Sequence, residues 1–248
     1  MTPPVFLTEP GDLDSDRVLL SGAEGRHAAT VRRITVGEVV HLADGTGTRA
    51  RCVVVAVGKD TVTCQVRERV VDPEPAPRIT VVQALPKGDR GELAVEVMTE
   101  AGVDAVTPWQ AERCVTRWKG DRAAKGPAKW RAAARAAAKQ ARRSRVPEVS
   151  GCASTREVAD LLGGASLGIV LHEEGAVRLS TLEPPEGAFD PGGEIVLVVG
   201  PEGGFTDAEL ACFDEAGAVR ALLGPTVLRT STAGVAALSV LQARCGRW

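Results

Sequence analysis

The feature that most constrains the fold is a change in hydrophobic pattern at a proline-rich stretch, residues 72–77 (DPEPAP). Three prolines in six residues can neither continue a β-strand nor begin a regular helix. Before this stretch the apolar residues mark short strands, and after it strands alternate with helices. The sequence therefore predicts two domains, residues 1–72 and 79–248, joined by a linker over residues 73–78.

The first domain is predicted to consist of β-strands. Apolar runs cover residues 38–43, 49–57 and 61–71, with tight turns between them. In the third run Val62, Cys64 and Val66 alternate with polar residues, which is the period of a half-buried strand. Short strands with tight turns and almost no helical pattern predict a small β-barrel.

The second domain is predicted to be α/β. Strands are expected at residues 79–84, 105–108, 166–171, 194–199 and 218–223, and helices at 90–101, 127–145, 154–162, 206–216 and 232–244. Ser154 with Glu157, and Thr206 with Glu209, have the spacing of capping boxes. In the first helix Leu93, Val97 and Ala101 share one face. This alternation predicts a mainly parallel sheet with helices on both faces.

Composition argues against a metalloprotein, a disulfide-linked protein and a membrane-spanning protein. The formal charge of −2 neither supports nor excludes a polyanionic partner, and the 44% of hydrophobic residues is enough for a core. The six cysteines contain no CxxC pair and the three histidines are scattered, so no metal site is expected and the thiols are expected to be reduced. With no signal peptide and no long apolar run, we expect a soluble, cytoplasmic protein.

A glycine-rich loop, Gly200–Phe205 (GPEGGF), follows the predicted strand at residues 194–199. Glycines at a strand's carboxyl end let the backbone approach a ligand, although a tight strand-to-helix turn explains them equally well. The chain contains neither GxGxxG nor GxxxxGK[ST]. We therefore expect a ligand that is not held through phosphate groups.

Two further loops follow predicted strands. The first, residues 223–232 (LGPTVLRTST), contains Arg229, which gains nothing from the dipole of the helix that follows and therefore suggests an RNA or active-site role. Ser231 and Thr232 could simply cap that helix. The second, residues 171–174 (LHEE), contains His172, and a lone histidine is more often structural than catalytic. Because all three loops follow strands of one sheet, they predict one shared site.

These motifs resemble a known family. The order LPKG (85–88), a basic segment from Lys129 to Val149 (KW…AAKQARRSRVPEV), LHEE, GPEGGF and LGPTVLRTSTA is similar to that of the RsmE family of ribosomal RNA methyltransferases, within the SPOUT superfamily. The resemblance spans nearly the whole chain. Its most specific part is GPEGG followed by LG-x-x-x-LR.

The resemblance implies a function and a fold. The implied reaction is transfer of a methyl group from S-adenosyl-L-methionine to N3 of a uridine in 16S ribosomal RNA of the small subunit. The implied fold is a C-terminal SPOUT-type domain with a trefoil knot and an N-terminal PUA-like β-barrel, in a homodimer joined through the last helix. The residues implied to bind the cofactor are Leu171, His172, Glu173, Val199, Gly200, Pro201, Glu202, Gly203, Gly204, Leu223, Gly224, Leu228, Thr230, Ser231 and Thr232.

The chain departs from the family pattern at two places. The family often has an acidic residue where this chain has Ser231, so no role of that carboxylate is carried over. It also often has an arginine beside an aromatic residue near the N-terminus, where this chain has Val5 before Phe6.

Positive charge is clustered between Arg122 and Pro147, where nine Lys or Arg residues occur with no Asp or Glu. On helical spacing, Arg131, Arg135, Lys139 and Arg142 would share a face opposite Trp130, Ala134, Ala137 and Ala141. An ordinary solvated helix usually mixes both signs, so the pattern favours RNA. The residues expected to contact RNA are Arg26, His27, Arg32, Arg33, Lys87, Arg131, Arg135, Lys139, Arg142, Arg143 and Arg145. An aromatic content of 3% argues against base stacking on an RRM-type sheet.

For catalysis, a cation near the uracil oxygens would stabilise the anion formed when N3 loses its proton, and Arg229 is the candidate. Glu202 and Glu173 are candidates for the general base, or serve only to order their loops. Two alternatives remain open: a related enzyme that methylates tRNA or a ribose 2′-hydroxyl, and a ribosome-assembly factor that binds RNA without chemistry.

Overall fold

The structure, a computed structural model, describes residues 3–248 of the 248-residue chain. Its residues group into two compact units. The first extends to Glu74 and also includes Ala138–Val146, and the second comprises Pro75–Ala137 and Pro147–Trp248. The sequence pattern did not indicate that residues 138–146 pack with the first unit, because they continue a helical pattern that begins in the second.

The first unit contains a five-stranded sheet with the order β1-β3-β4-β5-β2. The strands are β1 (Val5–Leu7), β2 (Arg17–Leu20), β3 (Val39–Ala43), β4 (Thr48–Val57) and β5 (Val62–Val71). All neighbouring strands are antiparallel except β1 and β3, which are parallel. The three strands expected from the sequence are present, whereas β1 and β2 are too short to show a periodic pattern.

The expectation of almost no helix in this unit was wrong. A 3-10 helix covers Asp12–Asp14, and α1 (Gly22–Arg26) continues into a turn of π-helix at His27–Val31. The core between these elements and the sheet includes Cys52 and Cys64. Burial raises the pKa of the Cys52 thiol to about 11 and that of Cys64 to about 12, so both stay protonated at neutral pH.

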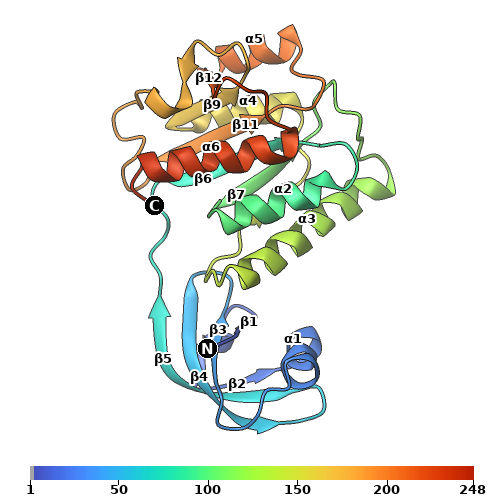
Figure 1. Cartoon of the computed structure of the whole chain (residues 1–248), viewed down its shortest axis with the longest axis vertical. Coiled ribbons are helices and arrows are strands. Elements are labelled where there is room, and N and C mark those ends of the chain that lie inside the picture. The colour runs from blue at the N-terminus through green and yellow to red at the C-terminus, as the bar shows by residue number, and fades with distance from the viewer. Residues whose placement is uncertain (1–2) are drawn as a thin grey trace. The chain divides into compact units, whose positions relative to one another are not determined.

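The second unit contains a seven-stranded sheet with the order β10-β12-β9-β11-β6-β7-β8 (Figure 1). Its strands are β6 (Arg78–Ala84), β7 (Ala105–Trp109), β8 (Glu148–Val149), β9 (Leu167–Leu171), β10 (Val177–Arg178), β11 (Glu194–Val199) and β12 (Val219–Leu222). Every neighbouring pair is parallel, which confirms the predicted parallel sheet. The central strands are almost wholly buried, as expected for a sheet covered on both faces.

Five helices belong to this α/β part of the chain: α2 (Arg90–Glu100), α3 (Asp121–Gln140), α4 (Thr155–Gly164), α5 (Asp207–Glu215) and α6 (Thr230–Arg244). A 3-10 helix covers Leu179–Thr181. Helix α6 packs on α2, β6 and β11, whereas α4 packs on α5 and β9. Figure 1 shows α2 and α6 in front of the sheet and α4 behind it. No helix within residues 3–248 is long and apolar enough to cross a membrane.

Local signals correctly placed the starts of α4 and α5. Both predicted capping boxes are present, with Ser154 and Glu157 at the start of α4 and Thr206 and Glu209 at the start of α5. Leu93, Val97 and Ala101 share one face of α2 as predicted, but Leu93 is 46% exposed, and the main buried stripe is formed by Ala94, Val95 and Met98. Two apolar stripes compete on this helix, and only packing against α6 and the sheet selects between them.

The limits of α3 also differ from the expected 127–145. The helix begins six residues earlier, at Asp121, with Pro127 inside it, and ends at Gln140. It ends because Arg142 adopts a left-handed conformation with φ 58°. The Arg142 N–H then donates to the Lys139 carbonyl (3.1 Å) and the Arg143 N–H donates to the Ala138 carbonyl (2.9 Å), the hydrogen bonds of a Schellman motif.

Candidate functional site

Three loops of the second unit meet at the carboxyl edge of the parallel sheet. Strand β9 lies between β11 and β12, and all three run in the same direction. The loops that begin at His172, Gly200 and Leu223 therefore leave the sheet side by side (Figure 1). In an open α/β sheet this edge is where ligands bind.

The glycine loop is shaped by Phe205. The Phe205 ring lies so close to Gly200 that a Cβ added there would be 2.6 Å from it. The ring also lies 5.8 Å from the Trp109 ring and 5.9 Å from the His172 ring, between centroids. Gly204 adopts φ +70°, which favours glycine. At least part of the glycine pattern therefore serves the turn itself, while Glu202 and Gly203 stay exposed.

Hydrogen bonds to two other loops hold the glycine loop in place. Arg113, after β7, donates from Nη1 to the carbonyls of Gly203 (3.2 Å) and Phe205 (2.9 Å). Glu202 accepts a hydrogen bond at Oε1 from the Lys87 backbone N–H (3.2 Å). Arg113 was not found from the sequence, because no local pattern reveals a contact 90 residues away. Glu202, expected as a base or a loop-ordering residue, has a loop-ordering contact.

The third loop is fixed where α6 begins. Gln83 is fully buried, and its Nε2 donates to the carbonyls of Ala84 (3.1 Å) and Thr230 (3.2 Å). Thr230 and Ser231 are buried in the first turn of α6. Arg229 precedes them, and its exposed guanidinium has no hydrogen-bond or ion-pair partner among residues 3–248. This leaves an exposed, unpaired cation in the third loop.

The remaining predicted residues divide between supporting and exposed positions. His172 accepts a hydrogen bond at Nδ1 from the Glu174 backbone N–H (3.1 Å), which gives the ring a structural role. Glu173 is exposed, whereas Val199 at the end of β11 and Pro201 within the glycine loop are buried. Thr232 donates from Oγ1 to the Arg229 carbonyl (3.3 Å), a bond within the first turn of α6. The N-cap of α6 is Arg229 and makes no side-chain cap, so Ser231 and Thr232 do not cap the helix as the sequence allowed.

The three loops offer both apolar surface and backbone with open space beside it. Leu171 and Leu223 are half-buried, and Leu228 is 39% exposed, so apolar surface is available. Nothing lies within 4 Å of a Cβ added to Gly224, so there is open space beside the backbone at this position. Backbone groups can read an adenine edge without cationic side chains. Within residues 3–248, no three His, Cys, Asp or Glu side chains are arranged to hold a metal ion.

The basic residues do not form one uniform RNA-binding face. The Arg131 Nε donates to the Val149 carbonyl (2.8 Å), and Arg145 donates to the carbonyls of Thr46 and Asp72. Arg135 and Arg143 also have partners. Exposed guanidinium groups remain at Arg26, Arg32, Arg33 and Arg142.

Lys139 is held inside the first unit. Its Nζ lies 2.7 Å from Glu24 Oε2, 2.8 Å from His27 Nδ1 and 5.0 Å from the centre of the Phe6 ring. Only 18% of the Lys139 side chain is exposed. Burial and the Lys139 charge lower the pKa of His27, so the imidazole is neutral at pH 7 and its Nδ1 accepts a hydrogen bond from the Lys139 ammonium group. Lys139 and His27, both expected to contact RNA, thus have an intramolecular role.

Comparison with known families defines the class of protein. Residues 72–242 match a family described as "RNA methyltransferase domain", and residues 20–67 match "RNA methyltransferase PUA domain". Together the two matches cover the parallel sheet with its three loops and most of the β-rich unit. The fold and the site therefore define an RNA methyltransferase with a PUA domain.

Individual relatives narrow this class. The chain is 48% identical over 235 residues to "Ribosomal RNA small subunit methyltransferase E" of Mycobacterium bovis, covering 93% of this chain and 87% of the relative. It is 32% identical to the Bacillus subtilis protein of the same name, covering 90% and 88%. The solved Neisseria gonorrhoeae protein of that name, bound to S-adenosyl methionine, matches with a TM-score of 0.85 and 30% identity over 98% of each chain. The chain belongs to the ribosomal RNA small subunit methyltransferase E family.

Proposed function

We propose that this protein transfers a methyl group from S-adenosyl-L-methionine to N3 of a uridine in 16S ribosomal RNA. The relatives' name and the bound S-adenosyl methionine of the Neisseria protein support the reaction class and the cofactor. The observation that carries the proposal is the meeting of three loops at one sheet edge, with an unpaired arginine, Arg229, among them. An rRNA substrate would be met in the cytoplasm.

Different residues of the chain would orient the cofactor and stabilise the charge that develops on the uracil. When bound, the cofactor supplies a methyl group on a positively charged sulfur. The backbone of the glycine loop and of residues 223–228 would hold and orient it, which is where much of the acceleration of an in-line transfer arises. Arg229 would stabilise the uracil oxygens as N3 loses its proton. Glu202 orders its loop through Lys87, so it is not assigned as the base.

The two parts of the chain would have separate roles. We assign RNA binding to residues 1–72, a linker to residues 73–78 and methyl transfer to residues 79–248. The match of residues 20–67 to a PUA domain supports the first role. The exposed arginines of this part, Arg26, Arg32 and Arg33, are the groups available to phosphates.

A trefoil knot in the second unit is part of the proposal. Strand β12 lies beyond β9, whereas α6 packs on β6 and β11. Residues 223–229 therefore have to return past the loops that leave β9 and β11. This path supports a threaded arrangement of the three loops.

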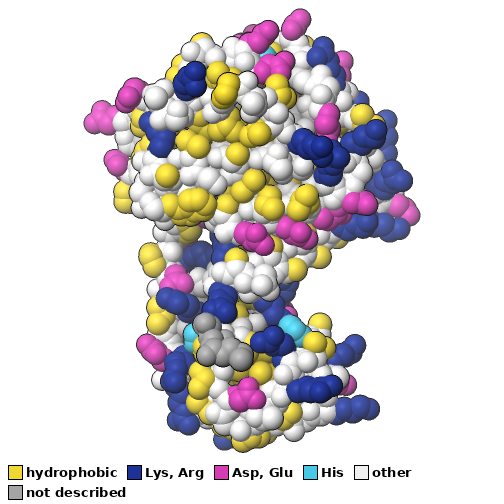
Figure 2. All heavy atoms as spheres, in the orientation of Figure 1, with side chains coloured by type: hydrophobic (Ala, Val, Ile, Leu, Met, Phe, Trp, Pro, Cys, Tyr) yellow, Lys and Arg dark blue, Asp and Glu magenta, His cyan; other side chains and the backbone are white. Residues whose placement is uncertain are grey.

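A homodimer through α6 is also proposed. Figure 2 shows apolar side chains along the face that α2 and α6 occupy in Figure 1. Leu93 of α2 is 46% exposed, and Val235 and Val240 of α6 are only half-buried. A second copy of the chain would cover this surface.

The test is a labelling experiment. The purified protein is incubated with small ribosomal subunits that lack the modification and with methyl-labelled S-adenosyl-L-methionine, and the digested nucleosides are identified by mass spectrometry. Label in 3-methyluridine is expected. Label in another nucleoside or in tRNA would indicate a related methyltransferase instead. Intact cofactor binding without any label would indicate an RNA-binding assembly factor, the alternative that Ser231 favours.

The role of Arg229 has its own test. Arg229→Ala is expected to keep cofactor binding, measured by calorimetry, and to lose turnover by roughly 100-fold or more, the scale of removing one oxyanion-stabilising donor. Unchanged turnover would remove Arg229 from the mechanism.

A further inference from the structure

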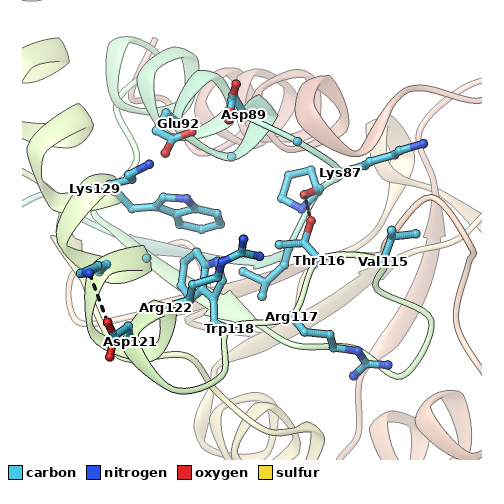
Figure 3. A pocket seen from close by; sticks show the side chains of 17 residues that line it. Lys87, Asp89, Glu92, Val115, Thr116, Arg117, Trp118, Asp121, Arg122 and Lys129 are labelled. Carbon is cyan, nitrogen blue, oxygen red and sulfur yellow. Dashed lines mark hydrogen bonds and ion pairs between the residues drawn. The ribbon is translucent and has the colours of Figure 1, made fainter.

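A hollow lies beside the glycine loop, within the second unit. It has a volume of about 800 Å³ and is bounded by the LPKG loop after β6, the start of α2, residues 115–118 and the first turns of α3 (Figure 3). The residues implied by the family resemblance to bind the cofactor do not line it. The hollow is therefore distinct from the proposed cofactor site.

Two indole rings form part of its wall. The rings of Trp118 and Trp130 meet edge to face, with 5.2 Å between centroids and 79° between planes. Trp130 is 2% exposed, whereas Trp118 is half-buried and open to the hollow. A Cβ at Gly126 would lie 2.4 Å from the Trp118 ring, and one at Gly91 would lie 2.7 Å from the Trp130 ring. Both rings are thus fixed against backbone that only glycine allows.

Positive charge surrounds these rings. Lys87, Arg122 and Lys129 are exposed, and their side chains have no hydrogen-bond or ion-pair partner among residues 3–248. Figure 3 shows Arg122 reaching over the hollow beside Trp118, with Lys87 and Lys129 on opposite sides of the rim. The lining also has two paired cations, Lys125 with Asp121 and Arg117 with the Glu112 carbonyl, and the carboxylates Asp89 and Glu92.

The hollow is tied directly to the proposed cofactor site. The backbone N–H of Lys87, on its rim, donates to Glu202 of the glycine loop (3.2 Å). Thr116 donates from Oγ1 to the Pro86 carbonyl (2.7 Å), which joins residues 115–118 to the LPKG loop (Figure 3). A strand that brings one nucleotide to the glycine loop would therefore pass the indole of Trp118 next.

We propose that this hollow binds an unpaired RNA nucleotide adjacent to the methylated one, an inference that rests on the proposed function. The base stacks on Trp118, and its phosphates contact Arg122, Lys87 and Lys129. A fixed aromatic face with free cations around it is the arrangement that holds single-stranded nucleic acid without regard to sequence. The low aromatic content argued against stacking on a sheet, but here two of the four tryptophans stand between loops and helices.

The first test compares Trp118→Ala and Trp118→Phe. Binding of a fluorescent ten-nucleotide oligouridine is measured by anisotropy, with a duplex of the same length as the structural control. Trp118→Ala is expected to weaken oligouridine binding about 10-fold, since the stacking of one base on an aromatic side chain is lost. Trp118→Phe should retain most of the affinity, and the duplex should bind all forms alike. Trp248→Ala, at a tryptophan that is 64% exposed and outside the hollow, is the matched control.

Cofactor affinity serves as the check on folding. If Trp118→Ala binds oligouridine as tightly as the unsubstituted protein, the inference is overturned. If Trp118→Ala also loses cofactor binding, that variant is misfolded, and Arg122→Ala, a change at an exposed, unpaired residue, tests the inference instead. It should lower the salt dependence of oligouridine binding by about 0.7 in slope, the loss of one single-strand phosphate contact. An unchanged slope would equally overturn the inference.

Methyl transfer separates this inference from the proposed function. Trp118→Ala should raise KM for the small subunit about 10-fold, with kcat and cofactor affinity unchanged. If the unsubstituted protein binds oligouridine through Trp118 but methylates no uridine, nucleotide binding in the hollow is supported and the proposed reaction is refuted. If uridine is methylated and Trp118→Ala leaves KM unchanged, the reaction stands and the hollow fails.

Discussion

Replacing Lys139 by methionine tests the assignment of this residue to the interior of the first unit. The change keeps the aliphatic stem and removes the ammonium group, which contacts Glu24, His27 and the Phe6 ring. Exposed ion pairs contribute about 0–1 kcal/mol, and breaking a fully buried pair costs about 3–5 kcal/mol. The side chains of Lys139 and Glu24 are 18% and 23% exposed, so the expected loss lies between these limits. We expect Lys139→Met to lower the free energy of unfolding by about 2 kcal/mol at pH 8.

The pH dependence makes this prediction specific. In the unsubstituted protein, burial and the Lys139 charge hold the pKa of His27 below its ordinary value of 6.5. The stability of the folded protein therefore falls as the pH drops below 6.5, because the unfolded chain takes up the proton more readily. Without Lys139, a protonated His27 can pair with Glu24. The variant should therefore lose less stability on acidification, and the difference from the unsubstituted protein should shrink at about pH 5.5.

Urea unfolding followed by circular dichroism measures the free-energy difference, and hydrogen exchange of peptides from residues 3–31 locates it. Lys125→Met is the matched control, because its ion pair with Asp121 is 73% and 90% exposed. That control should cost less than about 0.5 kcal/mol. Equal losses for the two variants, or a Lys139→Met loss that is the same at both pH values, would refute the buried-pair argument.

Three other changes probe the loops and the first unit. Arg113→Ala should weaken cofactor binding, measured by calorimetry, about 5- to 30-fold, because charge-assisted hydrogen bonds to Gly203 and Phe205 are lost from an exposed site. Arg113→Lys should restore only part of the cofactor affinity, and full affinity in Arg113→Ala would show that Arg113 does not order the glycine loop. Gly200→Ala should lower stability by about 1–3 kcal/mol in thermal unfolding, since its Cβ meets the Phe205 ring; an unchanged midpoint would show that the ring yields. His27→Gln keeps an acceptor for the ammonium group and should reduce the loss of stability between pH 7 and 5.5, and an unchanged pH slope would show that His27 does not titrate as proposed.

The sequence alone determined what depends on neighbours along the chain. The change in pattern at residues 72–77, the strands and the two capping boxes follow from local periodicity and from side chains three residues apart. Three loops at strand ends also indicated one site, because parallel strands end at the same edge. The motif GPEGGF with LG-x-x-x-LR was specific enough to name a family.

Only the tertiary structure decided which distant residues meet. Strand order brings Arg113 to the glycine loop and Gln83 to the first turn of α6, contacts that span 90 and 147 residues. The same is true of Lys139, whose charge looked like part of an RNA-binding face until Glu24, 115 residues away, paired with it. Local pattern fixes which face of an element is apolar or charged, but not what that face meets. The partner is set by the packing of whole elements, and this decides whether a charged side chain is free to bind a ligand.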